Sequence, residues 1–136
     1  MVEETIQLLS DANRFGGTVV YYDHAHDELL ATLYKRCAFT LYPSIDEGFG
    51  LPIIESFSYG KAVIASTGGA LPEVVDGRSP TLDPTDELAW ERTIIDWFER
   101  PQERQKFERL IEAGTALSHD WSSVAPSLLR SVGLTA

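Results

Sequence analysis

Hydrophobic and polar positions along this chain switch repeatedly between the period of a buried strand and that of an amphipathic helix. Short apolar runs rich in β-branched and aromatic residues predict strands or extended pieces; these are "TVVYY" (18–22), "AFTLYPS" (38–44), "AVIAST" (62–67) and the weaker "SPTLDP" (79–84). Segments with apolar positions three or four residues apart predict helices; these are 4–14, 27–37, 51–60, 71–77, 85–100, 101–118 and 120–132. This alternation predicts an α/β fold with a mainly parallel sheet and helices on both of its faces.

Proline and glycine positions support these boundaries. Pro52 lies near the start of one predicted helix and Gly60 at its end, as the asymmetry of helix termini favours. Pro84 and Pro101 mark two later joints. The tryptophans Trp90 and Trp97 are seven residues apart in a predicted helix, so we expect them to pack in the core.

Length and charge bound the class of protein. A chain of 136 residues, with 43% hydrophobic and 24% charged positions, suits one globular domain. Eleven basic against twenty-one acidic side chains give a net charge of −10, which argues against binding to the phosphate backbone of nucleic acid. A small anionic ligand is still compatible with this charge, because helix N-termini bind phosphate locally.

The cysteine and histidine positions and the start of the chain limit the kinds of site and the cellular location that we expect. The single cysteine, Cys37, enters an apolar strand, so a packing role is favoured over a reactive thiol. The spacing of His24, His26 and His119 matches no metal-ligand pattern, and we expect no metal. The chain opens on "MVEETIQLL" instead of a signal peptide, and it has no run of apolar residues long enough to span a bilayer. We therefore expect a cytoplasmic protein.

The stretch "YPSIDEGFGLPIIESFSYG" places two glutamates around a glycine-rich bend. Glu47 precedes the bend, and Glu55 lies about one turn into the helix that follows. Gly48 and Gly50 are expected to adopt positive φ and to let a ligand approach the backbone. Residues 50–53 would present free N–H groups at the start of the helix. In parallel α/β sheets, ligands bind beyond the carboxyl ends of the strands, where this bend is predicted to lie.

Two carboxylate acceptors with amide donors between them suit a ligand with hydroxyls at both ends and phosphates in the middle. A nucleotide-sugar has this chemistry. The competing interpretation is that Glu55 caps its own helix and that Glu47 is a solvated loop charge.

The whole stretch "YPSIDEGFGLPIIESFSYGKAVIASTGGALPEVVDG" resembles the signature of the retaining glycosyltransferases of family 4, which have the GT-B fold. Flanking pieces resemble the same family: "DELLATLYKRCAFTLYPS" before the motif, then "LDPTDELAW" and "HDWSSVAPSLL" after it. The resemblance spans roughly residues 18–130.

The resemblance implies roles for individual residues. Glu47 would be the catalytic residue, contacting hydroxyls of the donor sugar, and Glu55 would hold the ribose. Backbone amides after Glu47 would contact the sugar and diphosphate, the end of the preceding strand would contact the base, and a further glycine loop would face the same site. These donor-binding residues are Gly48, Phe49, Gly50, Leu51, Tyr22, Asp23, His24, Gly68 and Gly69.

The resemblance also implies a place in a larger protein. Residues 1–136 would be a single, partial Rossmann-like domain, the C-terminal half of a GT-B fold truncated at its N-terminus, with C-terminal helices over about 86–131. The missing parts would be an earlier strand-helix-strand with basic diphosphate-binding residues and an N-terminal acceptor-binding domain. The isolated chain is expected to be inactive, with no metal and no cofactor besides the nucleotide-sugar substrate.

Expected partners are the nucleotide-sugar donor and a glycan or lipid-linked acceptor, and the rest of the protein could contact a membrane surface. The alternatives are a non-catalytic module that binds a nucleotide-sugar or a partner, and a nucleotide-sugar epimerase of similar fold.

Overall fold

The computed structural model describes residues 19–114 of the chain. The chain divides into two compact units, Met1–Leu33 and Tyr34–Ala136, each of which is described by itself. The predicted helices at 4–14 and 120–132 lie outside the described residues.

The described part of the first unit is an extended segment that leads into helix α2 (Asp27–Arg36); the last turn of this helix, from Tyr34 on, belongs to the second unit. The imidazole Nδ1 of His26 accepts a hydrogen bond from the Leu29 N–H at 3.2 Å, which satisfies one free amide at the start of α2. The strand predicted over 18–22 is wrong for its described residues: 19–22 form no strand, and Val20 is 65% exposed. Apolar, β-branched residues favour a strand only where a neighbouring strand pairs with their backbone, and residues 19–22 pair with none in the described chain.

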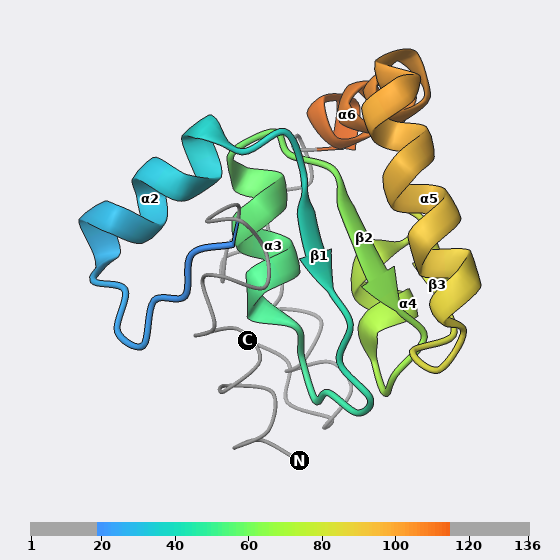
Figure 1. Ribbon diagram of the computed structural model, residues 1–136, viewed down its shortest axis with the longest axis horizontal. Coiled ribbons are helices and arrows are strands. Elements are labelled where there is room, and N and C mark those ends of the chain that lie inside the picture. Colours follow the sequence, from blue (N-terminus) through green and yellow to red (C-terminus); the bar gives the residue numbers. More distant parts are fainter. Residues whose placement is uncertain (1–18, 115–136) are drawn as a thin grey trace, which may run out of the picture. The chain divides into compact units, whose positions relative to one another are not determined.

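The second unit contains a three-stranded parallel sheet (Figure 1). Its strands are β1 (Thr40–Tyr42), β2 (Val63–Ser66) and β3 (Thr81–Leu82), in the order β1-β2-β3. The register aligns Tyr42 with Ala65 and Ser66 with Leu82, so the carboxyl ends of the three strands lie at one edge of the sheet. Each strand is shorter than its predicted run, because pairing ends where a neighbour ends.

Two helices connect the strands and two follow them. Helix α3 (Leu51–Ser58) contacts β1 and β2, and helix α4 (Leu71–Val75) contacts β2 and β3. Helix α5 (Glu87–Glu99) packs against helix α6 (Pro101–Gly114). All four residues of β2 are buried; since successive strand residues point to opposite faces, both faces of the sheet are covered. The predicted α/β fold is confirmed.

Local signals placed the helix ends accurately. Gly60 adopts φ 67° just after α3, as a C-terminal glycine does, and α6 begins at Pro101. Asp86 precedes α5 and accepts a hydrogen bond from the Ala89 N–H at 3.0 Å, a side-chain N-cap. Of the C-terminal helices predicted over about 86–131, the described part consists of α5 and α6 up to Gly114.

Aromatic side chains join α5 and α6 to the sheet. Trp97 is 2% exposed, and its ring makes an edge contact with Phe39, which leads into β1, at 5.1 Å between centroids. The ring of Phe107 in α6 lies 5.7 Å from Trp97 on a tilted plane. Trp90 is also buried, and its indole N–H donates to the Asp83 carbonyl at 2.9 Å. Both tryptophans therefore pack in the core, as their spacing predicted.

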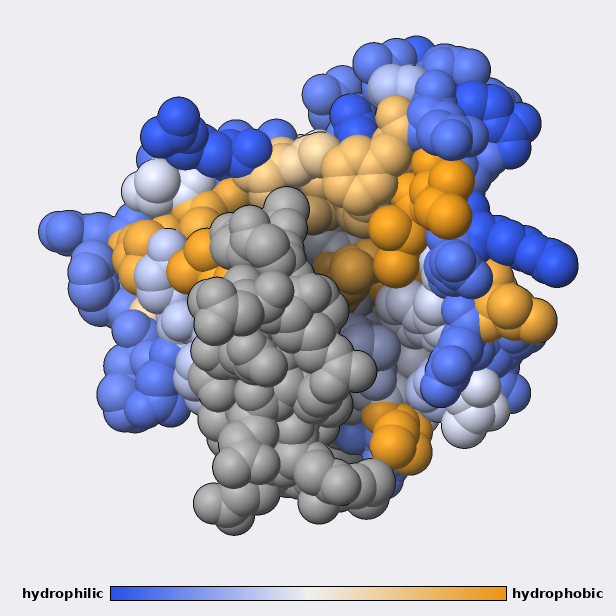
Figure 2. Space-filling model, in the orientation of Figure 1, coloured by the Kyte–Doolittle hydropathy of each residue, from blue (hydrophilic) through white to orange (hydrophobic). Residues whose placement is uncertain are grey.

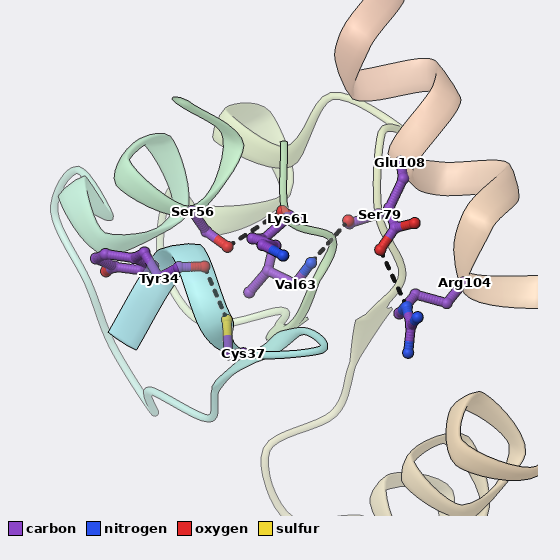
Figure 3. Close-up of polar contacts among 8 residues, drawn as sticks. All are labelled: Tyr34, Cys37, Ser56, Lys61, Val63, Ser79, Arg104 and Glu108. Atoms are coloured by element: carbon purple, nitrogen blue, oxygen red, sulfur yellow. Dashed lines mark hydrogen bonds and ion pairs between the residues drawn. The ribbon is translucent and has the colours of Figure 1, made fainter. Parts of the chain in front are cut away.

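Buried hydroxyls tie the sheet to its connections (Figure 3). The Ser79 hydroxyl accepts the Val63 N–H at 3.2 Å, and the Ser56 hydroxyl donates to the Lys61 carbonyl at 3.1 Å. Each bond satisfies a backbone group that the short strands leave unpaired.

Cys37 has the packing role that the sequence suggested. Its thiol is half-buried and donates to the Tyr34 carbonyl at 3.3 Å (Figure 3). Burial raises the pKa of the Cys37 thiol, and a raised pKa lowers the fraction of reactive thiolate.

Hydrophobic side chains also reach the surface along α5 (Figure 2). Leu88 is 61% exposed, Ile95 46% and Phe98 64%. Among residues 19–114, no helix combines the length and the apolar character needed to cross a membrane.

Replacing the central tryptophan tests this account of the core. Trp97→Ala removes a buried ring between Phe39 and Phe107, so we expect the free energy of unfolding to fall by about 3–5 kcal/mol. Leu88→Ala, on the exposed side of the same helix, should change it by less than about 0.5 kcal/mol. Urea unfolding followed by circular dichroism measures both; similar losses for the two variants would contradict the packing described.

Candidate functional site

The candidate site is built on the loop that leaves β1 at Tyr42 and enters α3 at Leu51. The carboxylate of Glu47 lies in this loop and is held at both oxygens. The Tyr42 hydroxyl donates to Oε2 at 2.6 Å, and the Gly48 N–H donates to Oε1 at 3.1 Å. The Tyr42 bond first, and then loop amides, lower the pKa of Glu47 below its ordinary value. The same bond raises the pKa of Tyr42 to about 12.

Glu55 lies in α3 and is also held by a phenol. The Tyr34 hydroxyl, from the end of α2, donates to Glu55 Oε2 at 3.0 Å and lies 3.4 Å from the Pro52 carbonyl. The ring of Tyr34 stacks on Tyr59, with centroids 5.4 Å apart and planes 7° from parallel. Burial first, and then the Glu55 bond, raises the pKa of Tyr34 to about 12.

The structure contradicts the competing interpretation for Glu55 but not for Glu47. The N-cap of α3 is Gly50, which has no side-chain hydrogen bond, so Glu55 does not cap its own helix. Glu47 does lie in a loop and is accessible to solvent, as that interpretation has it, and two donors order its carboxylate there.

The two glycines of the bend differ. Gly50 adopts φ 69° at the start of α3, as expected, and a Cβ there would lie 2.6 Å from Leu71 Cδ2. Gly48 does not have positive φ, so that prediction is wrong. A Cβ added to Gly48 would meet nothing within 4 Å. The fold itself gives no reason for a glycine at 48.

The second glycine loop packs directly on the first loop. A Cβ on Gly68 would lie 2.5 Å from the Ile45 carbonyl oxygen. Gly69 adopts φ 55°, and a Cβ there would lie 2.2 Å from the Glu47 carbonyl oxygen. The Ala70 N–H donates to that same oxygen at 3.1 Å. The structure thus brings Gly68 and Gly69 to Glu47, where they fix the backbone of the loop.

A further bond strengthens this junction. The Ser66 hydroxyl, at the end of β2, donates to the Ser44 carbonyl in the loop after β1. Ser66 is fully buried. This bond therefore joins the carboxyl ends of two neighbouring strands, β1 and β2.

The start of α3 presents further groups to solvent. Phe49 is 58% exposed and Leu51 59%. The expectation of free N–H groups over residues 50–53 is met only in part: Pro52 has no N–H, and the Ile53 N–H donates to the Gly50 carbonyl at 3.0 Å. The Leu51 amide, at the N-terminus of a helix without a side-chain cap, is suited to an anion. The Gly48 amide, by contrast, already donates to Glu47, so an incoming anion would compete for it with that carboxylate.

Tyr22, Asp23 and His24 belong to the first unit. Asp23 accepts a hydrogen bond from the Tyr21 hydroxyl at 3.2 Å, and His24 Nε2 lies 3.6 Å from Asp23 Oδ2 with the imidazole 95% exposed. Their contact with a nucleotide base stays a prediction.

Within residues 19–114 there is no group of three or more histidine, cysteine or carboxylate side chains placed to hold a metal ion. An open depression of about 590 Å³ lies against α5, lined by Pro43, Pro84, Glu87, Trp90, Glu91, Ile94 and Ile95. None of the predicted site residues is in its lining.

The sequence analysis missed the two tyrosines that hold the glutamates. Tyr42 ends a strand at the edge of the sheet where ligands bind, and that position was a usable signal. Tyr34 gave no such signal, because its hydroxyl meets Glu55 across 21 residues of chain.

The fold and site define an α/β protein with carboxylates and amides gathered beyond the end of β1. The chain belongs to the family of glycosyl transferases group 1, whose model matches residues 2–114. It is 43% identical over 70 residues to O-antigen chain mannosyltransferase B of Escherichia coli, covering 52% of this chain and 18% of that protein.

Two D-inositol 3-phosphate glycosyltransferases match over longer stretches. The protein from Mycobacteroides abscessus is 37% identical over 109 residues, covering 78% of this chain and 24% of the relative. The protein from Mycolicibacterium smegmatis is 30% identical over 130 residues, covering 94% of this chain and 29% of the relative. The chain spans less than a third of the length of these relatives.

The junction between the two loops predicts unequal effects of glycine substitution. Gly69→Ala places a Cβ against the Glu47 carbonyl and strains a positive φ, so the free energy of unfolding should fall by about 2 kcal/mol or more. Gly48→Ala should change it by less than about 0.5 kcal/mol, because the space there is open. Urea unfolding of both variants decides this, and equal losses would exclude the junction described.

The raised pKa of Tyr34 predicts a loss of stability in alkaline solution. Its folded pKa of about 12 exceeds the ordinary value of 10.0, so its contribution is complete below pH 10 and is lost as pH rises towards 12. The free energy of unfolding should therefore fall less steeply above pH 10 in Tyr34→Phe than in the unsubstituted chain. Urea titrations between about pH 9 and 11.5 compare the slopes; parallel curves would contradict the prediction.

Proposed function

We propose that this chain is the donor-binding part, the C-terminal half of a GT-B fold, of a retaining family 4 glycosyltransferase. The enzyme would transfer a sugar from a nucleotide-sugar to a glycan or lipid-linked acceptor. An N-terminal domain elsewhere in the protein would bind the acceptor. Family membership supports glycosyl transfer as the reaction class.

The observation that carries this proposal is the combination of Glu47 with Gly48. A carboxylate lies beyond the end of β1, and the glycine beside it is required neither by φ nor by packing. A glycine without an internal reason is explained by a ligand that approaches the backbone closely. In the proposal that ligand is the donor.

Each predicted site residue then has a role. Glu47 accepts hydrogen bonds from the donor sugar, and Glu55 accepts them from the ribose. The amides from Gly48 to Leu51 contact the sugar and diphosphate. Tyr22 to His24 contact the base, and Gly68 and Gly69 act by holding the Glu47 loop.

Charge stabilisation in this proposal comes from the protein without a metal. The Leu51 amide and the helix dipole at the start of α3 stabilise negative charge on the departing diphosphate, as oriented donors do for developing anions. The Glu47 carboxylate stabilises positive charge at the anomeric carbon as the bond to the diphosphate lengthens. Its lowered pKa keeps it ionised for that task.

Glycosyl transfer by the full-length protein tests the function directly. Product formation should be measured across a panel of nucleotide-sugars, with activated mannose first because relatives are named as mannosyltransferases. Transfer with one donor, and a product of unchanged anomeric configuration, is the expected result. Donor binding without transfer would favour the binding-module alternative, and an altered free nucleotide-sugar would favour the epimerase.

The two glutamates should affect different kinetic constants. Glu47→Gln removes a charge that stabilises the transition state, so kcat should fall roughly 10²-fold or more. Glu55→Gln weakens a contact shared by the ground and transition states, so the donor KM should rise about tenfold. Steady-state kinetics with varied donor concentration measures both.

Glu73→Gln is the matched control, since Glu73 is an exposed carboxylate in the first turn of α4. It should leave both constants near those of the unsubstituted protein. The assignment fails if Glu47→Gln keeps a normal kcat, or if Glu55→Gln abolishes turnover at saturating donor.

A further inference from the structure

Both glutamates of the site are oriented by a neutral donor. Among the described residues, neither Glu47 nor Glu55 forms an ion pair with a lysine, arginine or histidine. Their principal partners are the phenols of Tyr42 and Tyr34. The same arrangement therefore occurs twice, on two carboxylates that come from different parts of the site.

The Tyr42–Glu47 pair fixes the plane of a carboxylate. Its two oxygens accept hydrogen bonds from different parts of the chain: Oε2 from the Tyr42 hydroxyl of β1 at 2.6 Å, and Oε1 from the Gly48 N–H of the loop at 3.1 Å. A carboxylate held at both oxygens cannot rotate without breaking a charge-assisted bond. Backbone amides of Phe49 and Gly50 also act on this carboxylate, so its orientation is set by the strand side chain and the loop together.

The Tyr34–Glu55 pair is built from a more rigid donor. Tyr34 is 9% exposed, and its ring is stacked on Tyr59, so its hydroxyl has little freedom. That hydroxyl reaches Glu55 Oε2 at 3.0 Å. In the described chain, the carboxylate of Glu55 has no second hydrogen-bond partner, and its Oε1 is left for a ligand.

A neutral partner has a functional advantage over a cation here. A lysine or arginine would neutralise the carboxylate and occupy several of its lone pairs. A phenol donates a single bond, which orients the group and leaves its negative charge in place. Sugar hydroxyls need acceptors with free lone pairs, and a developing positive charge needs an unneutralised carboxylate.

We propose that Tyr42 and Tyr34 are positioning residues, Tyr42 for Glu47 and Tyr34 for Glu55. Tyr42 acts on the chemical step through Glu47, and Tyr34 acts on donor affinity through Glu55. This inference rests on the proposed function, because it assigns the two phenols to the two contacts with the donor.

The test uses phenylalanine substitutions in the full-length protein, which remove a hydroxyl and keep the ring. Tyr42→Phe should lower kcat about tenfold with little change in donor KM. Tyr34→Phe should raise donor KM about threefold with little change in kcat. Tyr59→Phe is the matched control: among the described residues its hydroxyl has no hydrogen-bond partner, and both constants should stay within about twofold.

Double substitutions separate positioning from a general structural effect. In a Glu47→Ala background, Tyr42→Phe should change kcat by less than about twofold, because the group it orients is gone. In a Glu55→Ala background, Tyr34→Phe should likewise leave donor KM unchanged. The proposal is overturned if, in either cycle, the effect of the tyrosine substitution is as large in the alanine background as in the unsubstituted protein. It is also overturned if Tyr42→Phe changes donor KM and Tyr34→Phe changes kcat.

NMR spectroscopy tests the two tyrosine–glutamate hydrogen bonds independently of enzyme activity. With ¹³C label at the tyrosine Cζ atoms of the 136-residue chain, Glu47→Ala should shift the Tyr42 signal and leave the Tyr34 signal in place. Glu55→Ala should do the reverse. If these shifts occur and the full-length protein transfers no sugar from any donor, the proposed function is wrong while the pairs exist. If they do not occur, the positioning proposal is wrong whatever the enzyme does.

Discussion

The packing of one backbone loop against another is the constraint on which this site depends. The loop after β2 approaches the loop after β1 so closely that only glycine fits at Gly68 and Gly69. The Ala70 N–H then bonds to the Glu47 carbonyl, and the Ser66 hydroxyl to that of Ser44. Parallel pairing of β1 with β2 makes this approach possible, because it brings both carboxyl ends to the same edge. The position of the Glu47 backbone is thereby set by the sheet.

Side-chain orientation is set by a second layer of contacts. Tyr42 and Tyr34 come from β1 and α2, and each places its hydroxyl on a carboxylate that lies later in the chain. The two carboxylates, in a chain of net charge −10, would repel an anionic ligand at long range. A phosphate can therefore bind here only through donors that contact it directly. The Leu51 amide at the uncapped start of α3 is such a local donor, and Gly48 has open space around it. Acceptors for hydroxyls and donors for phosphate are thus adjacent but distinct.

The basic side chain of Arg78 has a structural role. Arg78 donates to the Val74 and Val75 carbonyls at the end of α4, and its guanidinium lies 4.9 Å from the Phe57 ring centroid. These contacts stabilise the end of α4 and bind the helix to α3. Arg78 is therefore not assigned to the diphosphate in the proposed function.

The sequence by itself determined the elements whose signals are local. Helical periodicity, Pro52, Gly60 and Pro101 placed the helices within a few residues, because helix bonds and caps join near neighbours. The alternation of strands and helices determined the parallel sheet, and hence that Glu47 lies at its carboxyl edge.

Tertiary structure decided what depends on distant partners. Residues 19–22 have strand composition but no strand, because pairing needs a neighbour. Gly48 has no positive φ and open space around it, while Gly69 has φ 55° and lies against the Glu47 carbonyl of another loop. The bond from Tyr34 to Glu55 crosses 21 residues, so no periodicity could reveal it. Such contacts join residues that are distant in the sequence, and they form only when the folded chain brings those residues together.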